Sequence, residues 1–218
     1  MHLYGNNMLP SHIRALYDIA LCQTEYFGGH VDECDNCDYD RYIYHSCCNR
    51  NCPKCQGNHR EKWLEKRKLE ILPLTYFHVV FTLPEELRKI IRSNQKKLLS
   101  VLMKAAAYSL KKITTDSHYV GGKIGFLSVL HTWTQTMFYH PHAHCIVPAG
   151  ALSDEGKEWI YARKNYLIPI HALSQIFRAR FMKLARKALP NHIFPQSVWN
   201  QNWNVYSKPS VGQNRLRR

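Results

Sequence analysis

Seven of the eight cysteines lie between Cys22 and Cys55, and this concentration constrains the N-terminal region more than any other feature of the sequence. The segment contains two CxxC pairs, "CDNC" with Cys34 and Cys37, and "CPKC" with Cys52 and Cys55. The two-residue turn in each pair points both sulfurs at one centre, and two pairs complete a tetrahedral zinc site. The spacing therefore predicts one structural zinc ion held by these four cysteines.

Two further cysteines leave an alternative open. Cys22 and Cys47 fit a second zinc ion, because so short a segment has little core and depends on metal for its stability. They fit equally well as small buried apolar side chains. For Cys48 and His59 ordinary packing or solvation is the better interpretation. A redox dithiol is the alternative for the CxxC pairs, and a reducing cytosol disfavours it.

The charge of the chain indicates the class of partner. Lys and Arg outnumber Asp and Glu by 30 to 16, which gives a formal net charge of +14. This excess predicts a polyanion as partner, with an acidic membrane surface as the weaker option and a merely solvated surface as the alternative. No apolar run is long enough to cross a bilayer, and the N-terminus lacks a signal-peptide pattern. We therefore expect a cytoplasmic, nucleoid-associated protein.

Basic residues gather in two segments. One surrounds and follows the second CxxC pair, and the other lies on the outward face of a helix expected between Ser174 and Ala188. Clustered basic side chains beside a zinc knuckle or along one helix face are typical of modules that contact DNA phosphates. The residues that we predict to bind DNA are Arg50, Lys54, Arg60, Lys62, Arg178, Arg180, Lys183 and Arg186.

The remaining sequence alternates strand and helix patterns, which predicts an α+β fold. Helical patterns cover residues 59–72 and 85–113, the second with a break near Ser93 and Asn94. Runs of β-branched and aromatic residues predict strands at 75–84, 123–137, 142–152 and 203–208, with an antiparallel hairpin joining the middle two. We therefore divide the chain into a Cys-rich zinc-binding domain, residues 1–72, and a domain of strands and helices, residues 73–218.

The stretch "HPHAH" places histidines at alternate positions of a predicted strand. Alternate side chains share a face about 7 Å apart, so His142 and His144 could hold one divalent ion while Ala143 faces the core. If the hairpin turns near residues 138 and 139, Gln135 lies across from His142 and supplies an oxygen ligand. His140 precedes Pro141 in the turn, which favours a supporting or DNA-contacting role. By itself this short pattern fits ordinary, solvated histidines better than a metal site.

The order of the motifs along the chain favours the metal site over solvated histidines. "GGHVDECDNC", "SCCNRNCPKCQG", "FHVVFTLPEEL", "LHTWTQ", "HPHAHCIVPAGALS" and "WNVYSKP" together resemble the rolling-circle transposases of the insertion sequence ninety-one family, which are relatives of Helitrons. The resemblance implies a zinc-binding domain followed by an HUH nuclease domain, named for its His-hydrophobe-His motif, with a five-stranded antiparallel sheet. It implies Mn or Mg at His142 and His144, and a tyrosine that attacks a phosphodiester of single-stranded DNA to form a 5′-phosphotyrosine.

One departure from the family concerns that nucleophile. The resembled transposases carry a Tyr-x-x-x-Tyr pair shortly after the "VYSKP" segment, whereas none of the thirteen tyrosines here is followed by another four positions later. We therefore expect a C-terminally truncated transposase that binds DNA but does not nick it as this fragment. The alternative is a non-catalytic, zinc-containing DNA-binding remnant or a competitor of the parent transposase. An RNA-binding zinc protein is a weaker third interpretation.

Overall fold

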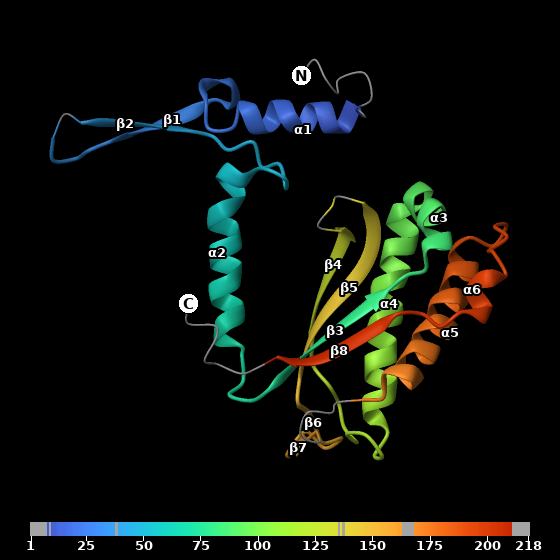
Figure 1. Cartoon of the computed structure of the whole chain (residues 1–218). Coiled ribbons are helices and arrows are strands. Elements are labelled where there is room, and N and C mark those ends of the chain that lie inside the picture. Colours follow the sequence, from blue (N-terminus) through green and yellow to red (C-terminus); the bar gives the residue numbers. More distant parts are fainter. Residues whose placement is uncertain are drawn as a thin grey trace. The chain divides into compact units, whose positions relative to one another are not determined.

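The computed structural model describes residues 8, 10–37, 39–134, 136, 138–162 and 168–210 (Figure 1). The chain separates into two compact units, Met1–Ile71 and Leu72–Arg218. None of the helices within the described ranges combines the length and the hydrophobicity needed to span a membrane. Each unit is described separately below.

The first unit contains two helices and a hairpin but almost no apolar core. Helix α1 (Pro10–Ala20) leads through a short 3-10 turn, η2 (Glu25–Phe27), into the antiparallel strands β1 (Gly29–Glu33) and β2 (Asp40–Tyr44), and helix α2 (Pro53–Leu69) follows. Among its described side chains only Cys22, Cys52 and Cys55 are buried. Because a two-stranded hairpin without a packed face is marginally stable, this unit needs another source of stability.

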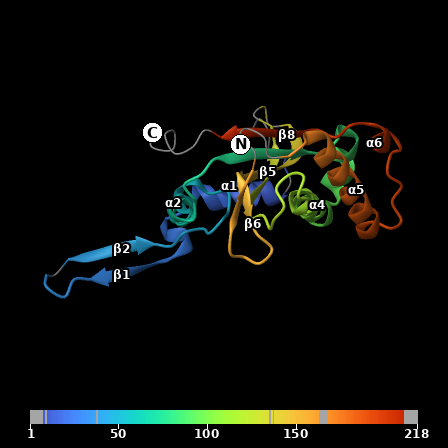
Figure 2. The same cartoon turned by 90° about the horizontal axis from the view of Figure 1, so that it is seen from below.

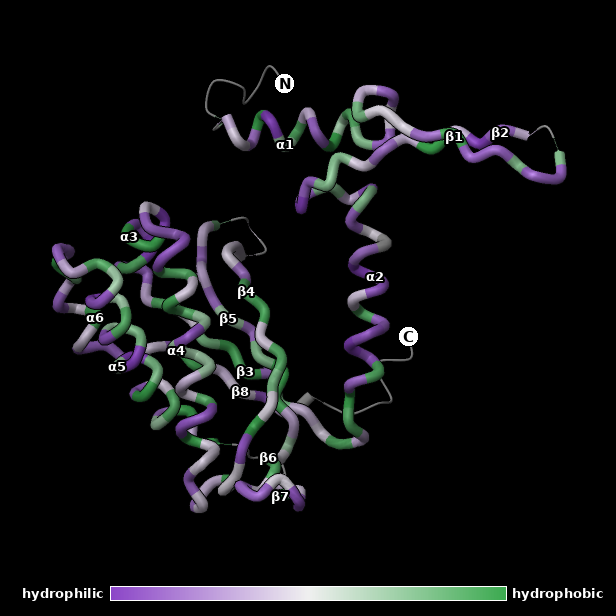
Figure 3. The backbone as a smooth tube through the Cα atoms, turned by 180° about the vertical axis from the view of Figure 1, so that it is seen from behind, coloured by the Kyte–Doolittle hydropathy of each residue, from purple (hydrophilic) through white to green (hydrophobic). Residues whose placement is uncertain are grey.

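Helix α2 begins six residues earlier than the predicted start at His59. Pro53 occupies the first turn, where a missing N–H has no cost, and Lys66, Arg67 and Lys68 lie in the last turn, where they complement the helix dipole. The "CPKC" stretch carries no amphipathic pattern, so periodicity alone did not reveal that its second cysteine is helical. Figure 3 shows α2 as largely hydrophilic along its length.

The second unit is built on an antiparallel sheet in the order β4-β5-β3-β8. Its strands are β3 (Tyr76–Thr82), β4 (Leu127–Trp133), β5 (Tyr139–Pro148) and β8 (Val205–Ser210). Two short strands, β6 (Gly150–Leu152) and β7 (Trp159–Tyr161), form a separate hairpin. Within the described residues the main sheet therefore has four strands, one fewer than the family resemblance implied.

Helices cover one face of this sheet (Figure 2). They are η3 (Glu85–Leu87), α3 (Arg88–Ser93), α4 (Gln95–Thr115), α5 (Ile170–Ala188) and α6 (Ser197–Asn200). The predicted helix break occurs at Asn94, which separates α3 from α4. The arrangement is the predicted α+β fold, with a Cys-rich segment followed by an antiparallel sheet packed against helices.

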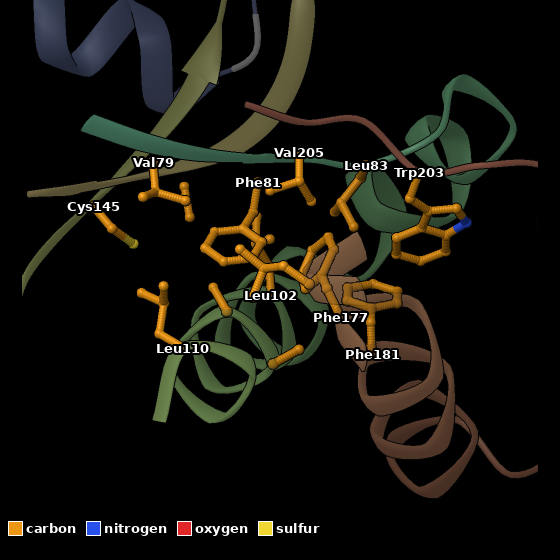
Figure 4. Close-up of a cluster of buried hydrophobic side chains, with 14 of the residues drawn as sticks. Val79, Phe81, Leu83, Leu102, Leu110, Cys145, Phe177, Phe181, Trp203 and Val205 are labelled. Carbon is orange, nitrogen blue, oxygen red and sulfur yellow. The ribbon is translucent and has the colours of Figure 1, made fainter. Parts of the chain in front are cut away.

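The core lies between the sheet and α4 and α5 (Figure 4). On β3 the side chains of Phe77, Val79 and Phe81 are buried, and the rings of Phe81 and Phe177 lie with their centroids 4.9 Å apart. Trp203 also packs in this core, with its ring centroid 5.4 Å from that of Phe177. Because side chains alternate along a strand, burying this set turns the intervening positions to the opposite, open face of the sheet.

Substituting Phe177 tests this packing. Phe177 is fully buried against Phe81, Phe181 and Trp203. We expect Phe177→Ala to lower the free energy of unfolding of the second unit by about 3–5 kcal/mol, because it removes a buried ring and leaves a cavity. Urea unfolding of the full chain measures the change. Ile193→Ala, at a position that is 92% exposed, is the control and should cost less than about 0.5 kcal/mol; equal losses would contradict the packing described.

Candidate metal centres and nucleic-acid-contacting residues

Four cysteines of the first unit converge on one point. They are Cys22 after α1, Cys47 after β2, and Cys52 and Cys55 at the start of α2, and their sulfurs all lie within 4.8 Å of one another. The Cys47 and Cys55 sulfurs are 3.8 Å apart. A tetrahedral zinc ion with Zn–S bonds of about 2.3 Å places its sulfurs about 3.8 Å apart, so the set fits a closed zinc site.

The hydrogen bonds and burial around these sulfurs fit a bound cation. The Cys55 amide donates to the Cys52 sulfur and lowers the pKa of that thiol to about 7. Burial raises the pKa of the Cys47 thiol to about 12, with the neighbouring sulfurs adding to the effect. Ionising all four thiols in so small a volume needs a positive charge between them, and a divalent ion supplies it.

This grouping differs from the predicted one. Cys52 and Cys55 lie with Cys22 and Cys47, not with Cys34 and Cys37. The latter pair is exposed in the loop that joins β1 to β2, and five residues of strand at about 3.3 Å each separate that loop from the base of the hairpin. A CxxC spacing brings two sulfurs together, but the path of the chain decides which pairs share an ion.

Cys34 and Cys37 nonetheless form a tight turn of their own. The Cys37 amide donates to the Cys34 carbonyl at 3.4 Å, and the Cys34 amide donates to the Tyr39 carbonyl at 3.2 Å. Hydrogen bonds from the Asn36 amide and from the Cys37 thiol and amide hold the pKa of Cys34 below its usual value. The turn offers two sulfurs, and zinc binding by this pair stays a prediction.

Three histidines converge on the open face of the second unit's sheet. His131 on β4 is paired with His142 on β5, and their ring nitrogens, together with those of His144, lie within 4.8 Å of one another. The ring centroids of His131 and His144 are 4.3 Å apart, and those of His142 and His144 are 4.8 Å apart. Ala143, between the two β5 histidines, is fully buried on the helix-covered face.

Hydrogen bonds orient two of these rings. The Nδ1–H of His142 donates to the His140 carbonyl at 2.6 Å, which leaves Nε2 free to bind a metal. His144 Nδ1 lies 2.7 Å from His78 Nε2 on β3, and the two rings are stacked with an interplanar angle of 7°. Metal-binding histidines are commonly oriented through their second nitrogen in this way.

The surroundings of His144 keep its ring neutral. Burial, reinforced by His131, His142 and His78, lowers the pKa of His144 to about 4. Since a histidine binds metal through an unprotonated nitrogen, the ring is in the binding form at neutral pH without having to lose a proton.

His131 was missed from the sequence because β4 ends at Trp133, so the turn comes earlier in the chain than predicted. The described register pairs His131 with His142 and Trp133 with Tyr139, with a shift between them, so the turn does not lie at residues 138 and 139. The predicted partner, Gln135, lies outside the described residues.

His140 supports the site rather than joining it. Its carbonyl accepts the hydrogen bond from His142, and its Nδ1 lies 2.9 Å from a guanidinium nitrogen of Arg88, which donates to it. Burial, with Arg88 adding to the effect, lowers the pKa of His140, so this ring also stays neutral.

Several of the predicted DNA-binding residues take part in internal contacts. Arg178 donates to the Gln201 carbonyl at 2.8 Å, and the Arg180 guanidinium lies 4.1 Å from the centroid of the Tyr108 ring. Arg186 lies 4.5 Å from the centroid of the Trp199 ring. Lys54 donates to the Cys22 carbonyl at 3.4 Å. The remaining four of the set, which are exposed, are Arg50, Arg60, Lys62 and Lys183.

The sheet face around the histidines also carries exposed apolar and basic side chains. An open pocket of about 360 Å³ is lined by Phe77, His78, Ile146, Tyr206, Lys208 and Pro209. Tyr206 and Ile146 are each about half exposed. Exposed rings next to a lysine suit nucleotide bases and the phosphates that join them.

Two transposase family models match separate parts of the chain. Residues 2–83 match the family model "Transposase zinc-binding domain", and residues 125–217 match the family model "Putative transposase". The "Putative transposase y4qJ" of Sinorhizobium fredii is 43% identical over 175 residues, which cover 80% of this chain and 44% of that protein.

The chain belongs to the rolling-circle transposases of the insertion sequence ninety-one family. The transposase for insertion sequence element IS801 of Pseudomonas savastanoi pv. phaseolicola is 27% identical and aligns with 89% of this transposase chain and 50% of its own length. The chain thus spans about half the length of the curated relatives that it matches. The cysteine cluster lies within the matched zinc-binding domain, and the two findings together support structural zinc in this unit.

Part of this transposase chain is also similar to a solved structure. The metal-bound conjugative relaxase TrwC in complex with oriT DNA covers 60% of the chain and is itself covered over 49% of its length. The TM-score is 0.43 and the sequence identity is 12%.

Single cysteine substitutions distinguish the observed grouping from the predicted one. We expect Cys22→Ser to remove the zinc of the four-cysteine site and to unfold residues 10–69, because three ligands no longer close the site. Cys34→Ser should retain that zinc and the fold around it, and Cys48→Ser is the exposed control. Metal analysis and hydrogen exchange of each variant measure the effect. Zinc lost in Cys34→Ser but kept in Cys22→Ser would restore the predicted set.

Proposed function

We propose that the second unit binds single-stranded DNA across the open face of its sheet and presents one phosphate to a divalent ion at His131, His142 and His144. The observation that carries the proposal is the convergence of three imidazoles on a solvent-facing sheet surface. Three protein ligands leave coordination positions open for a substrate oxygen, unlike the closed cysteine site of the first unit.

Three imidazoles narrow the choice of metal. A bound divalent ion would act as a Lewis acid, stabilising charge that develops on the phosphate and its leaving oxygen. Mg²⁺ prefers an octahedron of oxygen ligands, whereas Mn²⁺ accepts imidazole more readily. With a third histidine in the position first expected for an amide oxygen, we propose Mn²⁺ as the preferred ion.

The chain's own residues supply orientation and binding. His78 and the His140 carbonyl hold the rings of His144 and His142 so that their Nε2 atoms are available. Tyr206 and Ile146 offer apolar area to bases, and Lys208 offers a cation to a phosphate. Single-stranded DNA fits this surface better than a duplex, since only an unpaired strand can turn its bases toward the sheet.

The nucleophile is a separate question. Tyr206 on β8 and His144 on β5 both pair with Val80 on the central strand β3. Directly paired residues point to the same face of a sheet, so Tyr206 lies on the face that carries the histidines. The Tyr206 ring packs edge-on against His78, with the two ring centroids 6.4 Å apart. We therefore propose that Tyr206 positions DNA, and that cleavage by the whole family member requires a tyrosine pair absent from these 218 residues.

Manganese binding tests the metal part of the proposal. The double variant His142→Ala with His144→Ala should abolish Mn²⁺ binding, and His131→Ala should weaken it by roughly 10-fold or more because one of three ligands is lost. Titration followed by electron paramagnetic resonance measures the free ion. His118→Ala, at an exposed histidine that contacts Asp116, is the control and should bind as the wild type does. Unchanged Mn²⁺ binding by the double variant would contradict the site.

DNA binding separates the proposal from its alternative. We expect Mn²⁺ to raise the affinity of the wild-type chain for single-stranded oligonucleotides, and the double histidine variant to show no such increase, because the ion bridges protein and phosphate. No covalent protein–DNA band should appear on a denaturing gel. Binding that ignores both Mn²⁺ and the histidines would favour the non-catalytic remnant or competitor. A covalent band that disappears in Tyr206→Phe would show that Tyr206 is a nucleophile.

A further inference from the structure

Helices α3, α4 and α5 of the second unit carry only basic charged side chains. Residues 88–115, which form α3 and α4, contain eight Lys or Arg, and residues 170–188 of α5 contain five, while neither segment contains a single Asp or Glu. These two segments alone account for nearly all of the chain's net charge of +14. A solvated surface of a soluble protein ordinarily intersperses both signs, so this segregation calls for a functional explanation.

The exposed cations of α4 and α5 form one surface. Lys97, Lys104 and Lys111 recur every seven residues on the exposed side of α4, about 10 Å apart along the helix. Lys183 and Lys187 lie one turn apart on the exposed side of α5. Arg180 joins the two rows, because its guanidinium packs on the Tyr108 ring of α4. We call these six basic residues the helical cationic face.

This face points away from the metal site. The opposite side of α4 is buried, with Leu98, Leu102 and Ala105 fully enclosed in the core against the sheet. The three histidines lie on the other side of that sheet, and Figures 1 and 2 show α4 and α5 together on the helix-covered side. In the part of the chain that the structure describes, none of the six cations forms an ion pair.

We propose that the helical cationic face is a second nucleic-acid site, that it binds double-stranded DNA through backbone phosphates, and that it acts independently of the histidine site. The inference goes beyond the proposed metal-assisted reaction and does not rest on it. Lysines placed along two adjacent helices neutralise a high density of phosphates without reading sequence.

The side chains of this face favour a duplex over a single strand. Proteins that bind single strands present aromatic rings on which bases stack. Both helices are fully described, and their only exposed Phe, Tyr or Trp side chain is Tyr108, whose ring Arg180 occupies. The lysine row from Lys97 to Lys111 extends about 21 Å, and a duplex presents one charge per roughly 1.7 Å of its axis, twice the density along either of its strands. The open sheet face differs, because the exposed Tyr206 ring there lines a pocket beside Lys208.

Neutralising the lysines tests the proposal. The variant carries Lys97→Gln, Lys104→Gln, Lys111→Gln, Lys183→Gln and Lys187→Gln, all at exposed helix positions where glutamine preserves helix propensity. The probe is a random-sequence 20-base-pair DNA, titrated between 50 and 200 mM salt. We expect duplex affinity to fall on the order of 100-fold and the salt slope to drop by about one per lost phosphate contact. The Mn²⁺-dependent increase in single-strand binding should be unchanged.

The control replaces the same five lysines by arginine. It should keep duplex affinity and salt slope near wild type, which separates lost charge from damaged folding, and urea unfolding verifies that both variants fold. Wild-type duplex affinity in the glutamine variant would overturn the proposal, as would an equal loss in the arginine variant. Equal losses for duplex and single strand would overturn the assignment of a duplex. Preference for a double-stranded RNA of the same length would overturn the assignment of DNA.

Discussion

The antiparallel register of β4 against β5 and of β5 against β3 is the constraint on which the second unit depends. It sets His131 beside His142 and Val80 beside His144. The buried faces of these strands, with Phe81, Ala143 and Cys145 against the helices, hold that register in place. A slip of one residue would expose the apolar set and bury the imidazoles, so the packing that stabilises the fold also assembles the site.

The first unit depends on a different interaction. With cysteines as its only buried described side chains, it has no apolar core to offset the loss of chain entropy on folding. Metal coordination takes that role, because four ligands from three segments close on one ion and fix α1, the hairpin and α2 to one another. Because this unit buries few side chains, little of the α2 surface is covered by packing. Most basic side chains of α2 are therefore exposed and available to a polyanion.

Patterns that are local in the sequence were predictable, and pairings between distant segments were less so. The helix break at Asn94 and the strand that buries Phe77, Val79 and Phe81 follow from propensity and alternation. The cysteine partners did not, since CxxC spacing is equally compatible with two groupings and only the projection of the β1-β2 hairpin separates Cys34 from Cys52.

Two site features were missed for related reasons. His131 depended on a hairpin register that loop length alone did not specify, and His78 reaches His144 from a strand 66 positions away in the sequence. The packing of Arg180 on Tyr108 joins two helices and has no signature in either one. Each of these contacts is decided by tertiary structure, which single-sequence periodicity does not report.

The account rests most directly on a divalent ion that connects the three histidines to a DNA phosphate. Electron–nuclear double resonance on the Mn²⁺-loaded chain, with and without a single-stranded oligonucleotide, measures which nuclei surround the ion. The account predicts nitrogen couplings from imidazoles in both samples and a phosphorus coupling that appears only with DNA. Nitrogen couplings absent from both samples, or a phosphorus coupling that persists in the variant with His142→Ala and His144→Ala, would contradict it.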